Sequence, residues 1–123
     1  MEAIRNNLLV QTNIGGIARY TNDRYHQVSS NTKEIPGNPW IICTLWLAQY
    51  EIAAANTLDQ LQVPLQALRW VVQRSCRSGV LAEQVHPLTG EPLSVSPLTW
   101  SHAAFVITAM EYLAKWQQLQ KST

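Results

Sequence analysis

The stretch from residue 40 to residue 55, WIICTLWLAQYEIAAA, most constrains the fold, because it is apolar around almost the whole circumference of a helix. Before it, Asn38 can accept hydrogen bonds from free backbone N–H groups as an N-cap, and Pro39 fits the first helical position. These signals predict a helix from Pro39 to Ala55. A helix without a polar face is surrounded by protein on most of its sides, so this segment is predicted to be an inner helix.

The remaining segments have patterns of their own. Residues 1–10 are compatible with a short helix, and residues 15–37 are polar without any periodicity, which predicts an extended loop. Apolar residues at spacings of three and four predict an amphipathic helix over residues 64–75, whereas prolines and glycines exclude a helix from 79 to 97. The last helix is expected from residues 99–101 to about 119. Its apolar stripe consists of Val106, Met110, Leu113 and Trp116, with Ala103, Ala104 and Ala109 allowing close approach.

About four helices joined by long loops predict an all-α fold, and 123 residues are expected to form one domain, 1–123. A wholly apolar helix alternating with amphipathic ones is the pattern of an α/α toroid, in which inner helices are buried and the loops at one end line a cleft. A plain four-helix bundle fits the same pattern, and periodicity alone does not decide between the two.

Composition limits the classes of function. Charged residues make up 14% of the chain and the net charge is +1, without a basic run interleaved with aromatics, so we expect no nucleic-acid partner. The first residues lack the features of a secretory signal, and the longest apolar run is too short for a membrane span, which favours a cytoplasmic protein. Cys43 and Cys76 are expected to be reduced and buried. His26, His86 and His102 have no metal-ligand spacing, so no metal or other cofactor is predicted.

Four ordered blocks are specific to a family. These are GGIARYTNDRY (15–25), GNPWIICTLWLA (37–48), GVLAEQVHPLTGEP (79–92) and PLTWSHAAFV (97–106). In order and spacing they resemble the C-terminal part of the catalytic domain of glycoside hydrolase family 15, which contains glucoamylases and related inverting enzymes on an (α/α)6 barrel. The resemblance implies an α-glucan or oligosaccharide substrate and a partial toroid as the fold of this chain.

The resemblance also implies roles for individual residues. It places Glu83 at the general base that takes a proton from the attacking water, and Arg19 at the arginine that holds sugar hydroxyls. The other substrate-binding residues that it implies are Tyr20, Asp23, Tyr25, Trp40, Gln84 and Trp100. An aromatic surface suits the apolar face of a sugar ring, and a planar arginine suits its hydroxyls.

More ordinary interpretations compete with these roles. Without its flanking blocks, Glu83 is a solvated loop carboxylate and Arg19 a surface charge. Helical spacing makes Trp46, Trp70 and Trp116 core residues first. His102, at the start of the last helix, is expected to be a hydrogen-bonded packing residue.

Inverting hydrolysis needs a second carboxyl as general acid, and none of the other acidic residues matches the motif of the family's acid. We therefore expect little or no hydrolysis by this chain alone. An incomplete toroid leaves apolar helix faces uncovered, which predicts self-association, through Trp40, Trp46 and their helix, or a complementing chain with the rest of the barrel.

Three functions follow as hypotheses. The first is a glucoamylase-like hydrolase segment that acts once it is completed. The second is a non-catalytic carbohydrate-binding or helical self-association module derived from that family. The third is a relic without a ligand, stable because it oligomerises.

Overall fold

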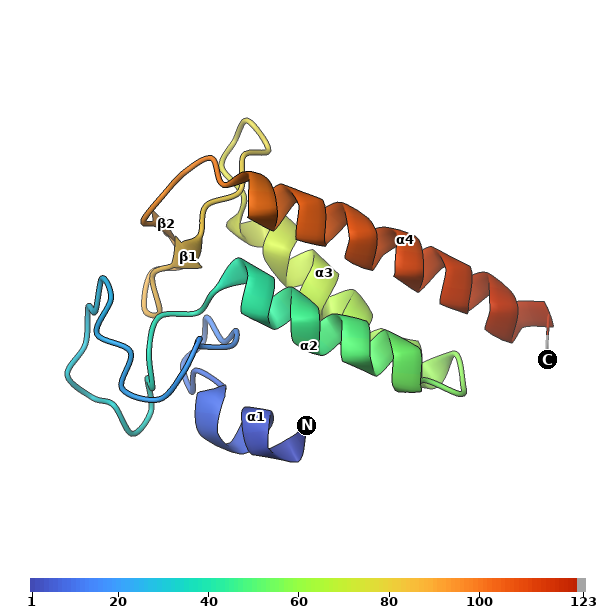
Figure 1. Cartoon of the computed structure of the whole chain (residues 1–123), viewed down its shortest axis with the longest axis horizontal. Helices are drawn as coiled ribbons and strands as arrows, with labels where there is room; N and C mark the ends of the chain where they lie inside the picture. The colour runs from blue at the N-terminus through green and yellow to red at the C-terminus, as the bar shows by residue number, and fades with distance from the viewer. Residues whose placement is uncertain (122–123) are drawn as a thin grey trace.

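The computed structural model describes residues 1–121 and confirms an all-α fold. Its helices are α1 (Glu2–Leu8), α2 (Ile41–Ala54), α3 (Gln62–Arg74) and α4 (Thr99–Lys121), with a 3-10 turn η1 (Asp59–Leu61) before α3. Figure 1 shows α2, α3 and α4 packed side by side, with α1 beside α2. The long loops gather at one end of these helices, where α2 and α4 begin. No helix within residues 1–121 combines the length and apolar character needed to cross a bilayer.

The loop between α3 and α4 contains a small hairpin that the sequence did not predict. Its strands β1 (Gln84–Val85) and β2 (Pro92–Leu93) pair antiparallel, with Gln84 opposite Leu93. The turn between them closes through Gly90, whose φ of +78° suits a residue without a side chain. The absence of helix from 79 to 97, which the prolines and glycines predicted, is confirmed.

The predicted N-cap of α2 is wrong. The helix begins at Ile41, and Trp40, in extended conformation, is the residue that precedes it. With Asn38 as the N-cap, the helix would have begun two residues earlier, at Pro39. Pro39 and Trp40 are held extended because the Trp40 N–H donates to the carbonyl of Ile17, and the Pro39 carbonyl accepts from Val85. The Ile41 N–H, one of the free donors of the first turn, is satisfied by the carbonyl of Glu83. A neighbouring loop therefore supplies the cap that the sequence assigned to a side chain.

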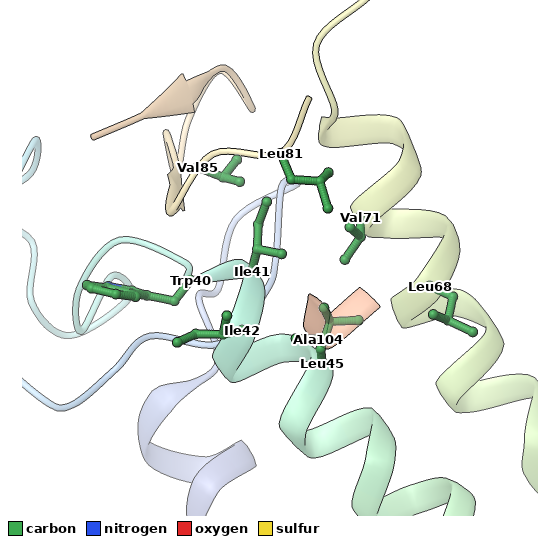
Figure 2. Packing of buried hydrophobic residues seen from close by; sticks show 9 residues of the cluster. All are labelled: Trp40, Ile41, Ile42, Leu45, Leu68, Val71, Leu81, Val85 and Ala104. Carbon is green, nitrogen blue, oxygen red and sulfur yellow. The ribbon is translucent and has the colours of Figure 1, made fainter. Parts of the chain in front are cut away.

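The core lies between α2, α3, α4 and the loop before β1. Figure 2 shows its buried side chains distributed around the first two turns of α2, with Leu68 and Val71 reaching them from α3. They are Trp40, Ile41, Ile42, Leu45, Leu68, Val71, Leu81, Val85 and Ala104. The core is thus densest at the end of α2 that carries the long loops, and it anchors those loops.

One face of α4 and one face of α2 are more exposed than the sequence predicted. Helix α4 packs against α2 through small residues, with Ser101, Ala104 and Thr108 buried, so the apolar stripe with Val106 and Met110 is exposed. Trp46, expected in the core, is also half-exposed, as is Tyr50 on the same helix. Hence α2 is not enclosed on all sides within the described residues.

Candidate functional site

Two loops meet at the start of α2 and form the candidate site. The loop of residues 9–40 pairs with itself through a bridge between Ala18 and Pro39, and Trp40 forms a bridge to Gln84 of the hairpin. Residue 16 allows this close approach, since a Cβ on Gly16 would lie 2.6 Å from the ring of Trp70 and 2.7 Å from Pro39. The segment with Arg19 and the segment with Glu83 are therefore both fixed to the same two residues, Pro39 and Trp40.

Arg19 and Asp23 form an ion pair within the first loop. Arg19 donates from Nε to Oδ2 of Asp23 at 2.9 Å and from Nη2 to Oδ1 at 3.1 Å, and Asp23 is only 2% exposed. Burial acts to raise the pKa of Asp23, but hydrogen bonds from Arg19 and from the Tyr25 N–H outweigh it and hold the pKa below its ordinary value. The same pair raises the pKa of Arg19. Both groups are therefore charged at neutral pH.

Aromatic rings surround the guanidinium of Arg19. Its central carbon lies 4.4 Å from the ring centroid of Trp40, 4.8 Å from that of Tyr20 and 5.4 Å from that of Tyr25. Trp40 is 5% exposed, and its buried Nε1–H has no hydrogen-bond partner among the described residues. The five residues of this loop to which the family resemblance assigned sugar binding thus form one cluster, in which Asp23 holds the guanidinium by two hydrogen bonds.

Glu83 lies directly before β1, and two neighbours donate to its carboxylate. Ser94 Oγ donates to Oε2 at 2.6 Å, and Gln84 Nε2 donates to the same oxygen at 3.2 Å. The backbone of Glu83 is fixed as well, because its N–H donates to the carbonyl of Val95 and its carbonyl caps α2. Glu83 is partly exposed, and these hydrogen bonds give its carboxylate a defined orientation.

Gln84 and Asn38 connect the two loops through buried amides. Gln84 is completely buried, and its Oε1 accepts a hydrogen bond from Asn38 Nδ2 at 3.0 Å. The same Nδ2 donates to the carbonyl of His26 at 2.8 Å. Side-chain hydrogen bonds therefore run from the Arg19 loop, through Asn38 and Gln84, to Glu83.

Trp100 does not join this cluster through any ring contact in the structure. It is half-exposed at the start of α4, and its ring lies edge-on to that of Trp46, with centroids 5.6 Å apart. The two rings form an exposed aromatic pair on the adjoining faces of α2 and α4. The substrate-binding role of Trp100 remains a prediction.

Sequence reasoning missed two residues of the site. Asn38 was assigned to capping and Ser94 was given no role, yet both form hydrogen bonds that orient the Glu83 carboxylate or its neighbour. For Ser94 the available signal was the turn around Gly90, since a hairpin there brings residues on either side of it together. For Asn38 there was no local signal, because its partners are 12 and 46 residues away.

His86 and His102 take part in hydrogen bonds that hold the backbone, and Cys43 is partly buried. His102 Nε2 accepts a hydrogen bond from the Leu81 N–H, which confirms its expected packing role, and His86 Nδ1 accepts from two N–H groups of the hairpin turn. Burial raises the pKa of the Cys43 thiol to about 11, so the thiol is protonated at neutral pH. Within residues 1–121, no three His, Cys, Asp or Glu side chains are grouped so as to hold a metal ion.

Comparison with known proteins gives a family match and a relative. A family profile described as Glycosyl hydrolases family 15 matches residues 66–110, the segment with Glu83, Gln84 and Ser94. An uncharacterized glycosyl hydrolase of Methanocaldococcus jannaschii is 36% identical over 107 residues, which cover 80% of this chain. The chain is a glycoside hydrolase family 15-like segment.

The family 15-like segment is much shorter than the archaeal protein. The matched region covers 16% of the length of the archaeal protein, so most of that protein has no counterpart here. No solved structure matches the family 15-like chain.

Proposed function

We propose that this chain provides the general-base half of an inverting α-glucoside hydrolase site, with Glu83 as the base. The observation that carries the proposal is the Glu83 carboxylate, which two donors fix at a junction with the Arg19 cluster. A general base must lie within hydrogen-bond reach of the water that it deprotonates, and donors bound to one carboxylate oxygen help to direct the other. The family resemblance supplies the reaction type.

The two donors to Glu83 both bind Oε2. Among residues 1–121, no group donates a hydrogen bond to Oε1 of Glu83. Oε1 is therefore the oxygen that would accept the proton of the attacking water. Fixing one carboxylate oxygen restricts the position of the other, and orientation of this kind contributes to the rate of hydrolysis.

The Arg19 cluster would bind the sugar. Nε and Nη2 of Arg19 donate to Asp23, and Nη2 also donates to Tyr20, so Nη1 is the group that remains for sugar hydroxyls. Tyr20 and Tyr25 are exposed beside it, and their rings suit the apolar face of a pyranose. An α-glucan or maltooligosaccharide is therefore the substrate class that we propose.

In this proposal, the general acid is not one of the residues of this chain. The acidic residues other than Glu83 do not match the acid's motif, and inversion needs carboxyls about 6.5–9.5 Å apart. We therefore place the acid, and the rest of an (α/α)6 toroid, in other polypeptide segments, so that α2 is an inner helix of the completed barrel.

The proposal can be tested with α-D-glucosyl fluoride, because fluoride departs without a proton from a general acid. We expect slow fluoride release, measured with a fluoride electrode. We expect β-glucose to be the first sugar product, identified by NMR. Glu83→Gln should lower the rate by about a hundredfold or more, since a general base contributes about 10² to 10⁴.

The matched control is Glu91→Gln, which removes an exposed carboxylate from the same hairpin loop. It should leave fluoride release unchanged. Equal rates for the unsubstituted protein and Glu83→Gln, or a product with retained configuration, would contradict the proposed base.

A second function, helical association, is favoured by one specific observation. The side of α4 away from Ser101, Ala104 and Thr108 exposes Val106, Met110 and Leu113, and the Trp46–Trp100 pair of α2 and α4 is exposed as well. Exposed apolar areas of this kind commonly mark protein contacts. We propose that this face binds the complementing part of the barrel or a second copy, so Met110→Lys should lower the sedimentation coefficient if copies associate.

A further inference from the structure

We propose that Asn38 is a positioning residue for the Glu83 carboxylate, acting through the side-chain amide of Gln84. This inference rests on the proposed function of Glu83 as the base. It assigns to Asn38 a role that is different from helix capping and that does not require contact with substrate.

The polarity of the hydrogen-bonded chain is set at its far end by a backbone group. The carbonyl of His26 can only accept, so the group of Asn38 that faces it must be the NH2 of the amide. His26 has a φ of +54°, and this left-handed conformation turns its carbonyl at that point of the loop. The Asn38 amide is thereby fixed in one of its two orientations.

Asn38 passes this orientation to Gln84. The two N–H bonds of Asn38 Nδ2 serve the His26 carbonyl and Gln84 Oε1, at 2.8 and 3.0 Å. With its oxygen held by Asn38, Gln84 has its NH2 free to point the other way, toward Glu83 Oε2 at 3.2 Å. A reversed Gln84 would place its carbonyl oxygen against the Glu83 carboxylate and its NH2 against that of Asn38.

Burial makes this arrangement rigid and costly to reverse. Asn38 is 2% exposed and Gln84 is fully buried, so water cannot replace a lost hydrogen bond without rearrangement of the loops. The backbone of Gln84 is fixed separately by its bridge to Trp40. Only the direction of the amide depends on Asn38, and it decides whether Gln84 presents a donor or an acceptor to Glu83, beside the donor that Ser94 already provides.

The first test is an NMR experiment on the unsubstituted protein, and it does not require catalysis. We expect the side-chain NH2 protons of Gln84 to exchange slowly and to show nuclear Overhauser contacts to the γ protons of Glu83. Contacts from these protons to the β protons of Asn38 instead would overturn the proposal, because they would show the opposite amide direction.

The second test is Asn38→Asp, which keeps the size of the side chain but removes both donors. Gln84 should reverse, so that its NH2 contacts move from Glu83 to the β protons of residue 38. With α-D-glucosyl fluoride, kcat should fall about tenfold or more while KM changes less than about twofold, because only the orientation of the base is altered.

Asn31→Asp is the matched control, since it makes the same chemical change at an exposed residue of the same loop, whose amide donates to Glu34. It should leave kcat and the Gln84 contacts unchanged. An unchanged Gln84 signature in Asn38→Asp, or an equal fall of kcat in Asn31→Asp, would overturn the positioning role. If Gln84 shows the expected contacts but Glu83→Gln does not affect turnover, the proposed base fails and the amide arrangement stands.

Discussion

Arg19 and Asp23 face each other through two parallel hydrogen bonds, 2.9 and 3.1 Å long, although they lie in a loop without helix or strand. Asp23 also accepts the N–H of Tyr25 at 3.0 Å. The backbone packs closely around the pair, because a Cβ on Gly37 would lie only 2.8 Å from the Cβ of Asp23. The pair therefore organises the loop as well as holding the guanidinium against its aromatic neighbours.

Asp23→Asn should destabilise the protein at pH 7 by about 1–3 kcal/mol, the usual range for hydrogen bonds to charged groups. The folded-state pKa of Asp23 is lower than its ordinary 3.8, so its contribution is present above that value and is lost as the pH falls through the folded pKa. Urea unfolding from pH 7 to pH 2 should therefore show the two proteins converging at acid pH. Asp59→Asn, at an exposed carboxylate of η1, should show a much smaller difference at pH 7.

Ser94 combines a left-handed backbone, with a φ of +65°, and a hydroxyl bound to Glu83. Ser94→Ala and Ser94→Gly both remove the hydroxyl, so both should lower fluoride release from α-D-glucosyl fluoride by a similar factor. Only glycine relieves the backbone conformation, so Ser94→Gly should be about 1 kcal/mol more stable than Ser94→Ala. If activity follows stability and differs between the two variants, the hydroxyl is not the cause of the loss.

Gly16 and Gly15 provide a pair of matched substitutions. Both have positive φ, +89° and +70°, so alanine strains the backbone at either position. A Cβ at Gly15 meets nothing within 4 Å, whereas at Gly16 it meets Trp70 and Pro39. Gly16→Ala should be less stable than Gly15→Ala by about 1–3 kcal/mol, the cost of overpacking, as measured by denaturant unfolding. Equal losses would show that the approach of Trp70 to Pro39 is not tightly packed.

Much of the helical architecture could be predicted from local patterns. The amphipathic segment around Leu68 and Val71 forms α3 with both residues buried, and Pro64 lies in its first turn, where its missing N–H is tolerated. The exclusion of helix from 79 to 97 followed from the same backbone chemistry. The position of α3 and the absence of helix from 79 to 97 depend on residues that are close in sequence, so both can be predicted from the sequence alone.

The faces of the helices could not be predicted in the same way. The stripe of Val106, Met110 and Leu113 has the spacing of a core face, yet α4 packs through Ala104 and Thr108. Thr108 contributes to this contact by accepting a hydrogen bond from Gln49 of α2 at 2.9 Å. Periodicity identifies the sides of a helix, but the side that is buried depends on which neighbour lies beside it.

By itself, the sequence determined an all-α chain, the absence of helix from 79 to 97, and a set of residues whose spacing resembles glycoside hydrolase family 15. Only the tertiary structure decided that Glu83 receives hydrogen bonds from Ser94 and Gln84, and that Asn38 links Gln84 to the Arg19 loop rather than capping α2. The physical reason is that helix propensity and turn chemistry act over a few residues, whereas these hydrogen bonds join groups up to 46 positions apart. Such groups meet only after the core around α2 has brought the loops together.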